Sequence, residues 1–144
     1  MRTVRTATSE ADIRRCFPVM RQLRARLTED EFVERVRRQA EAFGYTLIFL
    51  EESGSVSAVG GFRVTENLCD GRYLYVDDLV TDESARLKGC AGMLFDWIVA
   101  HARERGCTEI DLDSGVQRFD AHRFYLGRGM KISSHHFSMG LKQA

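Results

Sequence analysis

The chain begins with a short alternation of apolar and polar residues, and after it the apolar residues recur with the period of a helix. Residues 4–7 alternate as a first strand does. Ser9 and Asp12 then stand three residues apart, which resembles a capping box, so we expect a helix from about Glu10. Pro18 has no backbone N–H to donate, and we expect it to kink or break this helix.

A second helix is predicted by a clearer capping signal. Thr28 is followed three residues later by Glu31, and the apolar residues within 32–40 then recur on one helical face. Gly44 takes the left-handed conformation easily and is expected to end the helix.

The period changes after residue 44. Residues 45–50 and 55–64 are apolar runs separated by a polar turn that contains Gly54, which predicts a β-hairpin. Residues 72–80 form a nearly continuous apolar run, as is typical of a central strand.

The remaining elements follow with short connections. They are expected to be a helix over 89–105 ended by Gly106, a strand over 108–112, a short helix over 120–126 and a last strand over 131–141. The order is roughly β-α-α-β-β-β-α-β-α-β, which predicts a layered α/β fold in a single domain over residues 1–144.

Composition narrows the range of partners. The 21 Lys and Arg residues balance the 21 Asp and Glu residues, so there is no long-range field to gather nucleic acid or an anionic membrane. No apolar run is long enough to span a bilayer or to serve as a signal peptide. The four cysteines show no zinc-type spacing, so we expect reduced thiols in a cytoplasmic protein.

The most informative stretch joins the central strand to the helix over 89–105. The first turn of a helix presents N–H groups that have no intrahelical partner, at the positive end of the helix dipole. The small residues Gly89, Ala91 and Gly92 let a ligand approach the main chain, and Arg86 and Lys88 add positive charge. This pattern predicts a site for a pyrophosphate ligand.

The spacing of these residues also indicates a family. A P-loop needs Gly-Lys followed by Ser or Thr, and a Rossmann fingerprint needs GxGxxG after the first strand; neither is present. Arg86-x-x-Gly89-x-Ala91 instead resembles the pyrophosphate motif of the GNAT superfamily of acyl-CoA-dependent N-acetyltransferases. The segment from Ala121 through Tyr125 to Gly129 resembles a second motif of that family, although Met130 replaces its usual Phe and Arg118 an often-found Asn.

The resemblance implies a fold, a reaction and a cosubstrate. The fold would be a mixed central sheet with helices on both faces, and the reaction an acetyl transfer from acetyl-CoA to a primary amine by direct attack in a ternary complex. The residues implied to bind acetyl-CoA are Leu79 and Val80, by their main chain, and Arg86, Leu87, Lys88, Gly89, Cys90, Ala91 and Gly92. No metal is expected, because His135 and His136 are adjacent in the predicted last strand and would face opposite ways.

Two residues are candidates for catalysis. Tyr125 matches the family tyrosine that protonates or positions the departing coenzyme A thiolate; the alternative is a core aromatic on a short helix. Asp77 and Asp78 interrupt an apolar strand and are expected to face opposite sides of the sheet. Asp78 is the candidate general base, with structural hydrogen bonding as the alternative. Cys90 lacks a paired histidine and is expected to be a filler rather than a nucleophile.

A non-catalytic module that binds or senses acyl-CoA is the main rival to an enzyme, and the presence of Tyr125 favours the enzyme. The sequence leaves open the amine acceptor, the identity of the base, the use of longer acyl-CoAs and a homodimeric assembly.

Overall fold

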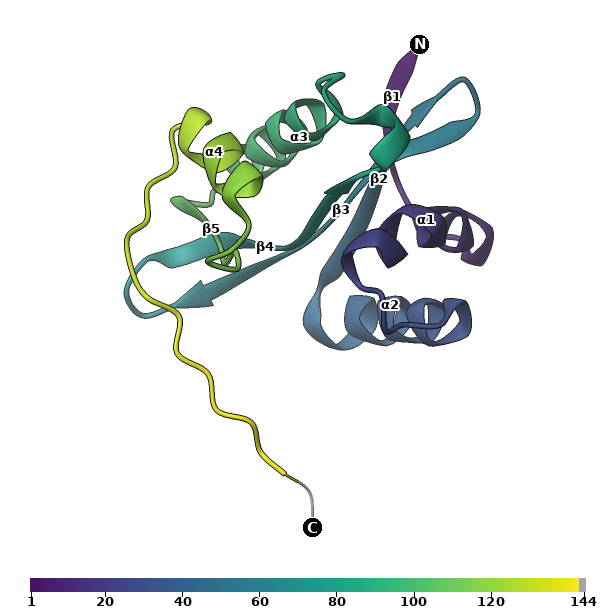
Figure 1. Ribbon diagram of the computed structural model, residues 1–144. Helices are drawn as coiled ribbons and strands as arrows, with labels where there is room; N and C mark the ends of the chain where they lie inside the picture. Colours follow the sequence, from purple (N-terminus) through teal and green to yellow (C-terminus); the bar gives the residue numbers. More distant parts are fainter. Residues whose placement is uncertain (143–144) are drawn as a thin grey trace. The chain divides into compact units, whose positions relative to one another are not determined.

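The computed structural model describes residues 1–142. The chain folds into two compact units, one over residues 1–112 and one that begins at Asp113. The first unit contains β1 (Arg2–Thr6), α1 (Glu10–Leu23), α2 (Glu29–Phe43), β2 (Tyr45–Glu52), β3 (Ser55–Asn67), β4 (Gly71–Thr81), the 3-10 turn η1 (Glu83–Ala85), α3 (Cys90–Glu104) and β5 (Glu109–Leu112) (Figure 1). The second contains α4 (Phe119–Gly127).

The five strands of the first unit form one mixed sheet in the order β1-β2-β3-β4-β5. The first three pairs are antiparallel, whereas β4 and β5 are parallel. Helices α1 and α2 pack on one face of this sheet and α3 covers the other (Figure 1). The predicted fold class is thereby confirmed.

Two apolar layers hold these helices on the sheet. Along β2, Leu47 and Phe49 belong to the cluster that includes the buried side chains of α1 and α2. The alternate residues Ile48 and Leu50 are also fully buried, and the pleat directs them to the opposite face, which α3 covers. Burial on both faces explains why residues 47–50 of β2 are all apolar.

The capping predictions for the first two helices are confirmed, and of the kink or break expected at Pro18 the break is wrong. The hydroxyl of Ser9 accepts from the backbone N–H of Asp12 at 3.1 Å. Gly44, with φ of 71°, is the left-handed residue that ends α2. Helix α1 runs through Pro18 to Leu23, since burying the apolar residues on either side of the proline stabilises the turn that lacks one hydrogen bond.

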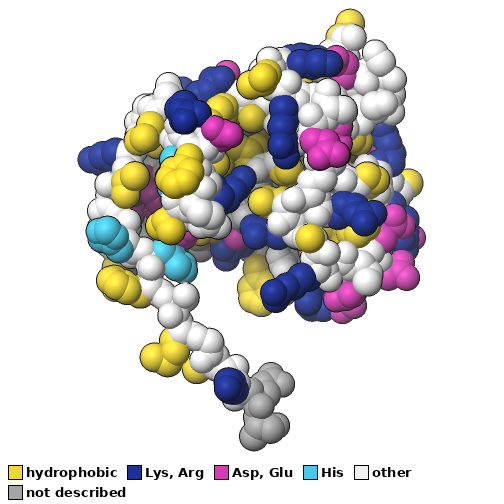
Figure 2. Space-filling model, in the orientation of Figure 1, with side chains coloured by type: hydrophobic (Ala, Val, Ile, Leu, Met, Phe, Trp, Pro, Cys, Tyr) yellow, Lys and Arg dark blue, Asp and Glu magenta, His cyan; other side chains and the backbone are white. Residues whose placement is uncertain are grey.

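The second unit corrects another expectation. Residues 131–141, predicted to be a last strand, form no strand among the described residues. Their apolar side chains are exposed (Figure 2), with Ile132 74% and Phe137 92% accessible. A strand needs a neighbour to pair its N–H and C=O groups, and within residues 1–142 no strand pairs with this segment. The pattern of side chains over residues 131–141 was therefore not sufficient to predict a strand.

Charges of both signs are interspersed over the surface of α1 and α2 (Figure 2). Arg14, for example, contacts Glu10 at 3.1 Å, Glu29 at 2.8 Å and Asp30 at 3.0 Å. Hydrogen bonds to Glu29 and Asp30 raise the pKa of Arg14. Such a face offers no patch of one sign to a polyanion. In the described part of the chain, no helix combines the length and apolarity that crossing a membrane requires.

Candidate active site

The loop that follows β4 ends in an uncapped helix start. Leu87 and Gly89 have positive φ values of 66° and 80°, and α3 begins directly afterwards. No side chain caps this helix, and its first backbone bond runs from the N–H of Met93 to the carbonyl of Gly89 at 3.1 Å. The amides of Cys90, Ala91 and Gly92 therefore precede the hydrogen-bonded ladder, at the positive end of a helix of 15 residues.

The main chain is open to approach at Gly89, just before these amides. A Cβ built on Gly89 would meet a single neighbour, the Nη1 atom of Arg2, at 3.9 Å. Leu87 and the charged residues Arg86 and Lys88 are exposed. A group with several anionic oxygens fits this arrangement, because main-chain donors can surround it and two cations lie beside it.

Residues far away in the sequence hold the loop in place. The guanidinium of Arg2 on β1 donates to the carbonyl of Lys88 at 2.7 Å and to Glu52 at 2.6 Å. Gln22 on α1 donates to Asp82 at 2.7 Å and accepts from the N–H of Glu83 at 3.0 Å. Hydrogen bonds from Ser84 and Gln22 lower the pKa of Asp82. Sequence reasoning missed Arg2 and Gln22, because only the tertiary fold brings them to the loop.

Strand β4 has one open edge beside this loop. β5 pairs with β4 only from Tyr73 to Val76, whereas Leu79 and Val80 pair with β3 alone. Within residues 1–112, the far side of β4 beyond Val76 thus has no strand against it. Main-chain groups on that side form no ladder with another strand of this unit.

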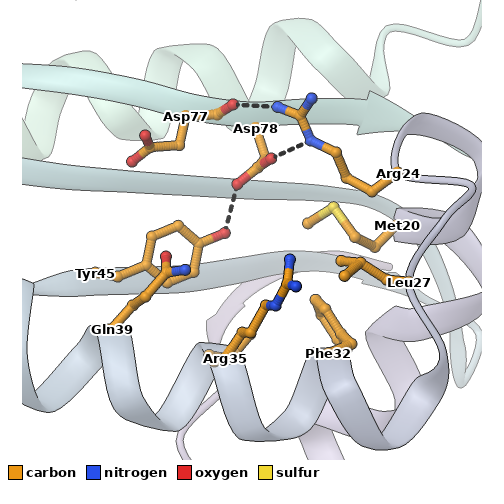
Figure 3. Close-up of a pocket in the computed structure, with 10 residues that line it drawn as sticks. Met20, Arg24, Leu27, Phe32, Arg35, Gln39, Tyr45, Asp77 and Asp78 are labelled. Carbon is orange, nitrogen blue, oxygen red and sulfur yellow. Dashed lines mark hydrogen bonds and ion pairs between the residues drawn. The ribbon is translucent and has the colours of Figure 1, made fainter. Parts of the chain in front are cut away.

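A pocket of about 240 Å³ lies in the first unit, between helices α1 and α2 and strands β2 and β4 (Figure 3). It is lined by Met20, Arg24, Leu27, Phe32, Arg35, Val36, Gln39, Tyr45, Asp77 and Asp78. At its centre, the carboxylate of Asp78 accepts from the hydroxyl of Tyr45 at 2.7 Å and from Nε of Arg24 at 2.8 Å. Its side chain is only 13% exposed, so these two donors fix its position.

Asp77 and Asp78 do not alternate as expected. Both line the pocket, because Gly61 pairs with Asp78 but Phe62 pairs with Val76, which leaves Asp77 as the extra residue of a β-bulge. The prediction that the two carboxylates face opposite sides of the sheet is wrong for this reason. The Asp77 carboxylate accepts two hydrogen bonds from Arg63, each of 2.8 Å.

Tyr45 depends on the glycine opposite it. Its hydroxyl lies where a Cβ on Gly61 would stand, so only a glycine lets the ring cross β3 to reach Asp78. Burial and the charge of Asp78 raise the pKa of Tyr45 well above its ordinary value, which keeps it a hydrogen-bond donor. Sequence reasoning missed Tyr45; the signal was the Gly60-Gly61 pair inside an apolar strand.

Tyr125 lies in the second unit, on α4, where it is half-buried. Its ring meets that of Phe124 edge-on, with 5.5 Å between centroids. Burial raises the pKa of the phenol above its ordinary value, while Arg118 opposes the shift. The phenol is therefore protonated at neutral pH, as a proton donor must be, and its catalytic role stays a prediction.

Cys90 is 2% exposed, and its thiol contacts the carbonyl of Ala85 at 3.8 Å. A buried thiol bonded to a main-chain carbonyl has the surroundings of a packing residue rather than of an activated nucleophile.

Comparison with known proteins defines the class of protein. Residues 10–130 match the model of the acetyltransferase (GNAT) family. The uncharacterized N-acetyltransferase YhdJ of Bacillus subtilis is 34% identical over 131 residues, which cover 90% of this chain and 92% of the relative. The chain therefore belongs to the GNAT family and is an acetyl-CoA-dependent acyltransferase.

Solved structures show the same fold. A transcriptional regulator from Bacillus halodurans has a TM-score of 0.86 at 25% identity, covering 98% of this chain and 100% of that one. AAC(6')-Iy, in complex with a bisubstrate analogue of CoA and acetylneamine, has a TM-score of 0.86 at 13% identity, covering 99% of each chain.

Proposed function

We propose that this protein transfers the acetyl group of acetyl-CoA to a primary amine, by direct attack of the amine in a ternary complex. The observation that carries the proposal is that β4 connects two sites of different chemistry. Asp78 lines the charged pocket, and the next two residues, Leu79 and Val80, lie on the open edge of the strand that leads to the uncapped start of α3.

The cosubstrate is assigned to the main chain. The amides of residues 87–92 would hold the pyrophosphate, with Arg86 and Lys88 beside it. Leu79 and Val80 would hold the pantetheine arm, and one of their amides would polarise the thioester carbonyl as an oxyanion-type donor. Acetyl-CoA would supply the activated acetyl group.

The acceptor is assigned to the pocket. As the amine attacks, its N–C bond forms, the C–S bond breaks and the amine loses a proton. Asp78 would accept that proton directly or through water, while Tyr45 and Arg24 hold its carboxylate in place. Tyr125 would return a proton to the departing thiolate.

The rival hypothesis of a non-catalytic acyl-CoA sensor is disfavoured by the family and by the N-acetyltransferase relative, although one similar structure belongs to a protein described as a transcriptional regulator. An acetyl-CoA-dependent enzyme suits a cytoplasmic protein, and the four cysteines are free, as in a reducing compartment.

One experiment tests the proposal: calorimetry with coenzyme A, followed by thiol release from acetyl-CoA in the presence of an amine panel. Direct transfer to an amine gives both binding and amine-dependent release, with intersecting initial-rate lines. Binding without release from any amine would contradict the amine acceptor, and the absence of binding would refute the proposal as a whole.

A further inference from the structure

Three of the four charged side chains that line the pocket already have strong partners. Both oxygens of Asp77 are bonded to Arg63, a residue of β3 that does not line the pocket. Asp78 and Arg24 are bonded to each other, and Arg24 also donates to the carbonyl of Asp77 at 2.8 Å. The Asp77–Arg63 pair and the Asp78–Arg24 pair each carry no net charge, so they offer little net charge to a ligand.

Arg35 is different. Within residues 1–142 its guanidinium has one ion-pair contact, to Glu31 one helical turn away, at 3.9 Å, which is too long for a hydrogen bond. Both side chains are about half exposed, at 50% and 48%, and such a pair contributes little. Figure 3 shows Arg35 rising from α2 into the pocket, on the wall opposite the strand that carries Asp78. Its N–H groups are available to an anion.

Apolar side chains line the space between these walls. Met20, Leu27 and Phe32 form one side of the pocket. The volume of about 240 Å³ is below the roughly 300–1,000 Å³ of pockets that enclose drug-sized ligands. The pocket itself therefore encloses a small group with a short aliphatic section.

We infer that the acceptor is a compact amine that also carries an anionic group, a carboxylate or a phosphonate, with its amine beside Asp78 and its anion on Arg35. The inference rests on the proposed function and specifies its substrate class. The planar guanidinium binds either anion through paired N–H groups, and it repels a second ammonium group, which disfavours polyamines.

The test uses the full chain and four acceptors of similar length: 2-aminoethylphosphonate, 3-aminopropanoate, propylamine and 1,3-diaminopropane. We expect kcat/KM for at least one of the two anionic amines to exceed that for propylamine by about 10-fold or more, with the diamine poorest. The ratio between phosphonate and carboxylate identifies which anion the site prefers.

A matched pair of variants locates the effect. Arg35 and Arg38 both lie on α2, both pair with a glutamate one turn away and are 50% and 55% exposed, but only Arg35 lines the pocket. Arg35→Gln should reduce the preference for the anionic amine over propylamine by about 10-fold, whereas Arg38→Gln should leave it unchanged. A merely structural role of Arg35 would lower both rates together and keep their ratio.

The other outcomes are equally decisive. If acetyl-CoA is consumed with propylamine or the diamine as fast as with the anionic amines, the substrate class is wrong and the proposed transfer stands. If no amine reacts, calorimetry of the two anionic amines with the coenzyme A-loaded protein decides, and an absence of binding overturns the inference. Failure to bind coenzyme A refutes the proposed function itself.

Discussion

The two sites that β4 connects differ in which part of the chain would bind a ligand. In the loop before α3, the side chains are exposed and the donors are backbone amides at an uncapped helix start. In the pocket, the chemistry belongs to side chains, and hydrogen bonds of 2.7 to 2.8 Å from Tyr45 and Arg24 hold the carboxylate of Asp78. A site made of amides should tolerate changes of side-chain chemistry but not of bulk, whereas the pocket should be sensitive to the chemistry of its side chains.

This difference suits one ligand that is always the same and a second ligand that varies between acetyltransferases. The pyrophosphate of acetyl-CoA is the same for every acetyl transfer, and amides set by helix geometry can bind it. Acceptor amines vary in charge and shape, and side chains such as Arg35 and Asp78 can be exchanged without altering the fold.

The largest expected effect comes from adding bulk and charge where the main chain binds. Gly89→Glu should weaken coenzyme A binding by about 10³-fold, because it costs about two hydrogen bonds to charged oxygens at about 2 kcal/mol each. Gly106→Glu is the control, since Gly106 has a similar positive φ of 72° and open space around it. Calorimetry of both variants checks the prediction, and equal affinities would show that the loop is not the site.

Removing a charge from the pocket without changing the size of the side chain should lower the rate of transfer and leave coenzyme A binding unchanged. Asp78→Asn keeps the shape of the side chain and removes its charge, so we expect kcat to fall about 10²-fold if the carboxylate accepts the amine proton, with coenzyme A affinity unchanged. Asp77→Asn removes the neighbouring charge, which is bonded to Arg63, and should cost far less. Equal losses in the two variants would return Asp78 to a structural role.

The loop was the part that could be predicted from the sequence. Its donors are amides whose positions follow from where a helix begins, and the small residues around Gly89 are visible in the sequence itself. Local signals likewise predicted both caps, the hairpin and α3, since capping and periodicity involve residues within a turn or two of each other.

The pocket could be predicted only in part. Asp78 was noticeable as a carboxylate in an apolar strand, but Tyr45 lies 33 residues away and Arg24 lies 54 away. Nothing local indicates that these three side chains meet. The bulge that turns Asp77 to the same face is also a property of strand pairing and not of the strand's own sequence.

Tyr125 tests whether the second unit adds chemistry to these two sites. Tyr125→Phe removes one hydroxyl and keeps the ring and its contact with Phe124. We expect kcat to fall about 10-fold with acetyl-CoA affinity unchanged, as for loss of a general acid. Steady-state kinetics with an acceptor whose chemistry limits the rate checks this. A change confined to KM would indicate positioning, and unaltered kcat a packing role.

The glycine pair of β3 gives a smaller effect that is specific to the pocket. Gly61→Ala forces Tyr45 away from its place, because the added Cβ overlaps the phenol, and we expect a loss of about 1–3 kcal/mol in unfolding free energy. At Gly60 the nearest side-chain atom, Cγ1 of Ile48, would be 3.4 Å away, so Gly60→Ala should cost less. Chemical denaturation of both variants measures the difference, and the reverse order would contradict the assigned geometry.

The smallest effect is expected at Cys90. This residue could contribute its backbone amide to pyrophosphate binding or its thiol to catalysis, and a substitution separates the two roles. Its amide is retained in Cys90→Ala, and within residues 1–142 the hydrogen-bond partner of the buried thiol is a main-chain carbonyl. We therefore expect kcat within about twofold of the parent, with a stability loss of about 1 kcal/mol from the small cavity. A direct transfer needs no acetylated enzyme, so mass spectrometry after incubation with acetyl-CoA alone should find the thiol free. Trapped acetyl on Cys90, or parallel initial-rate lines, would replace the ternary complex with a two-step transfer through the thiol.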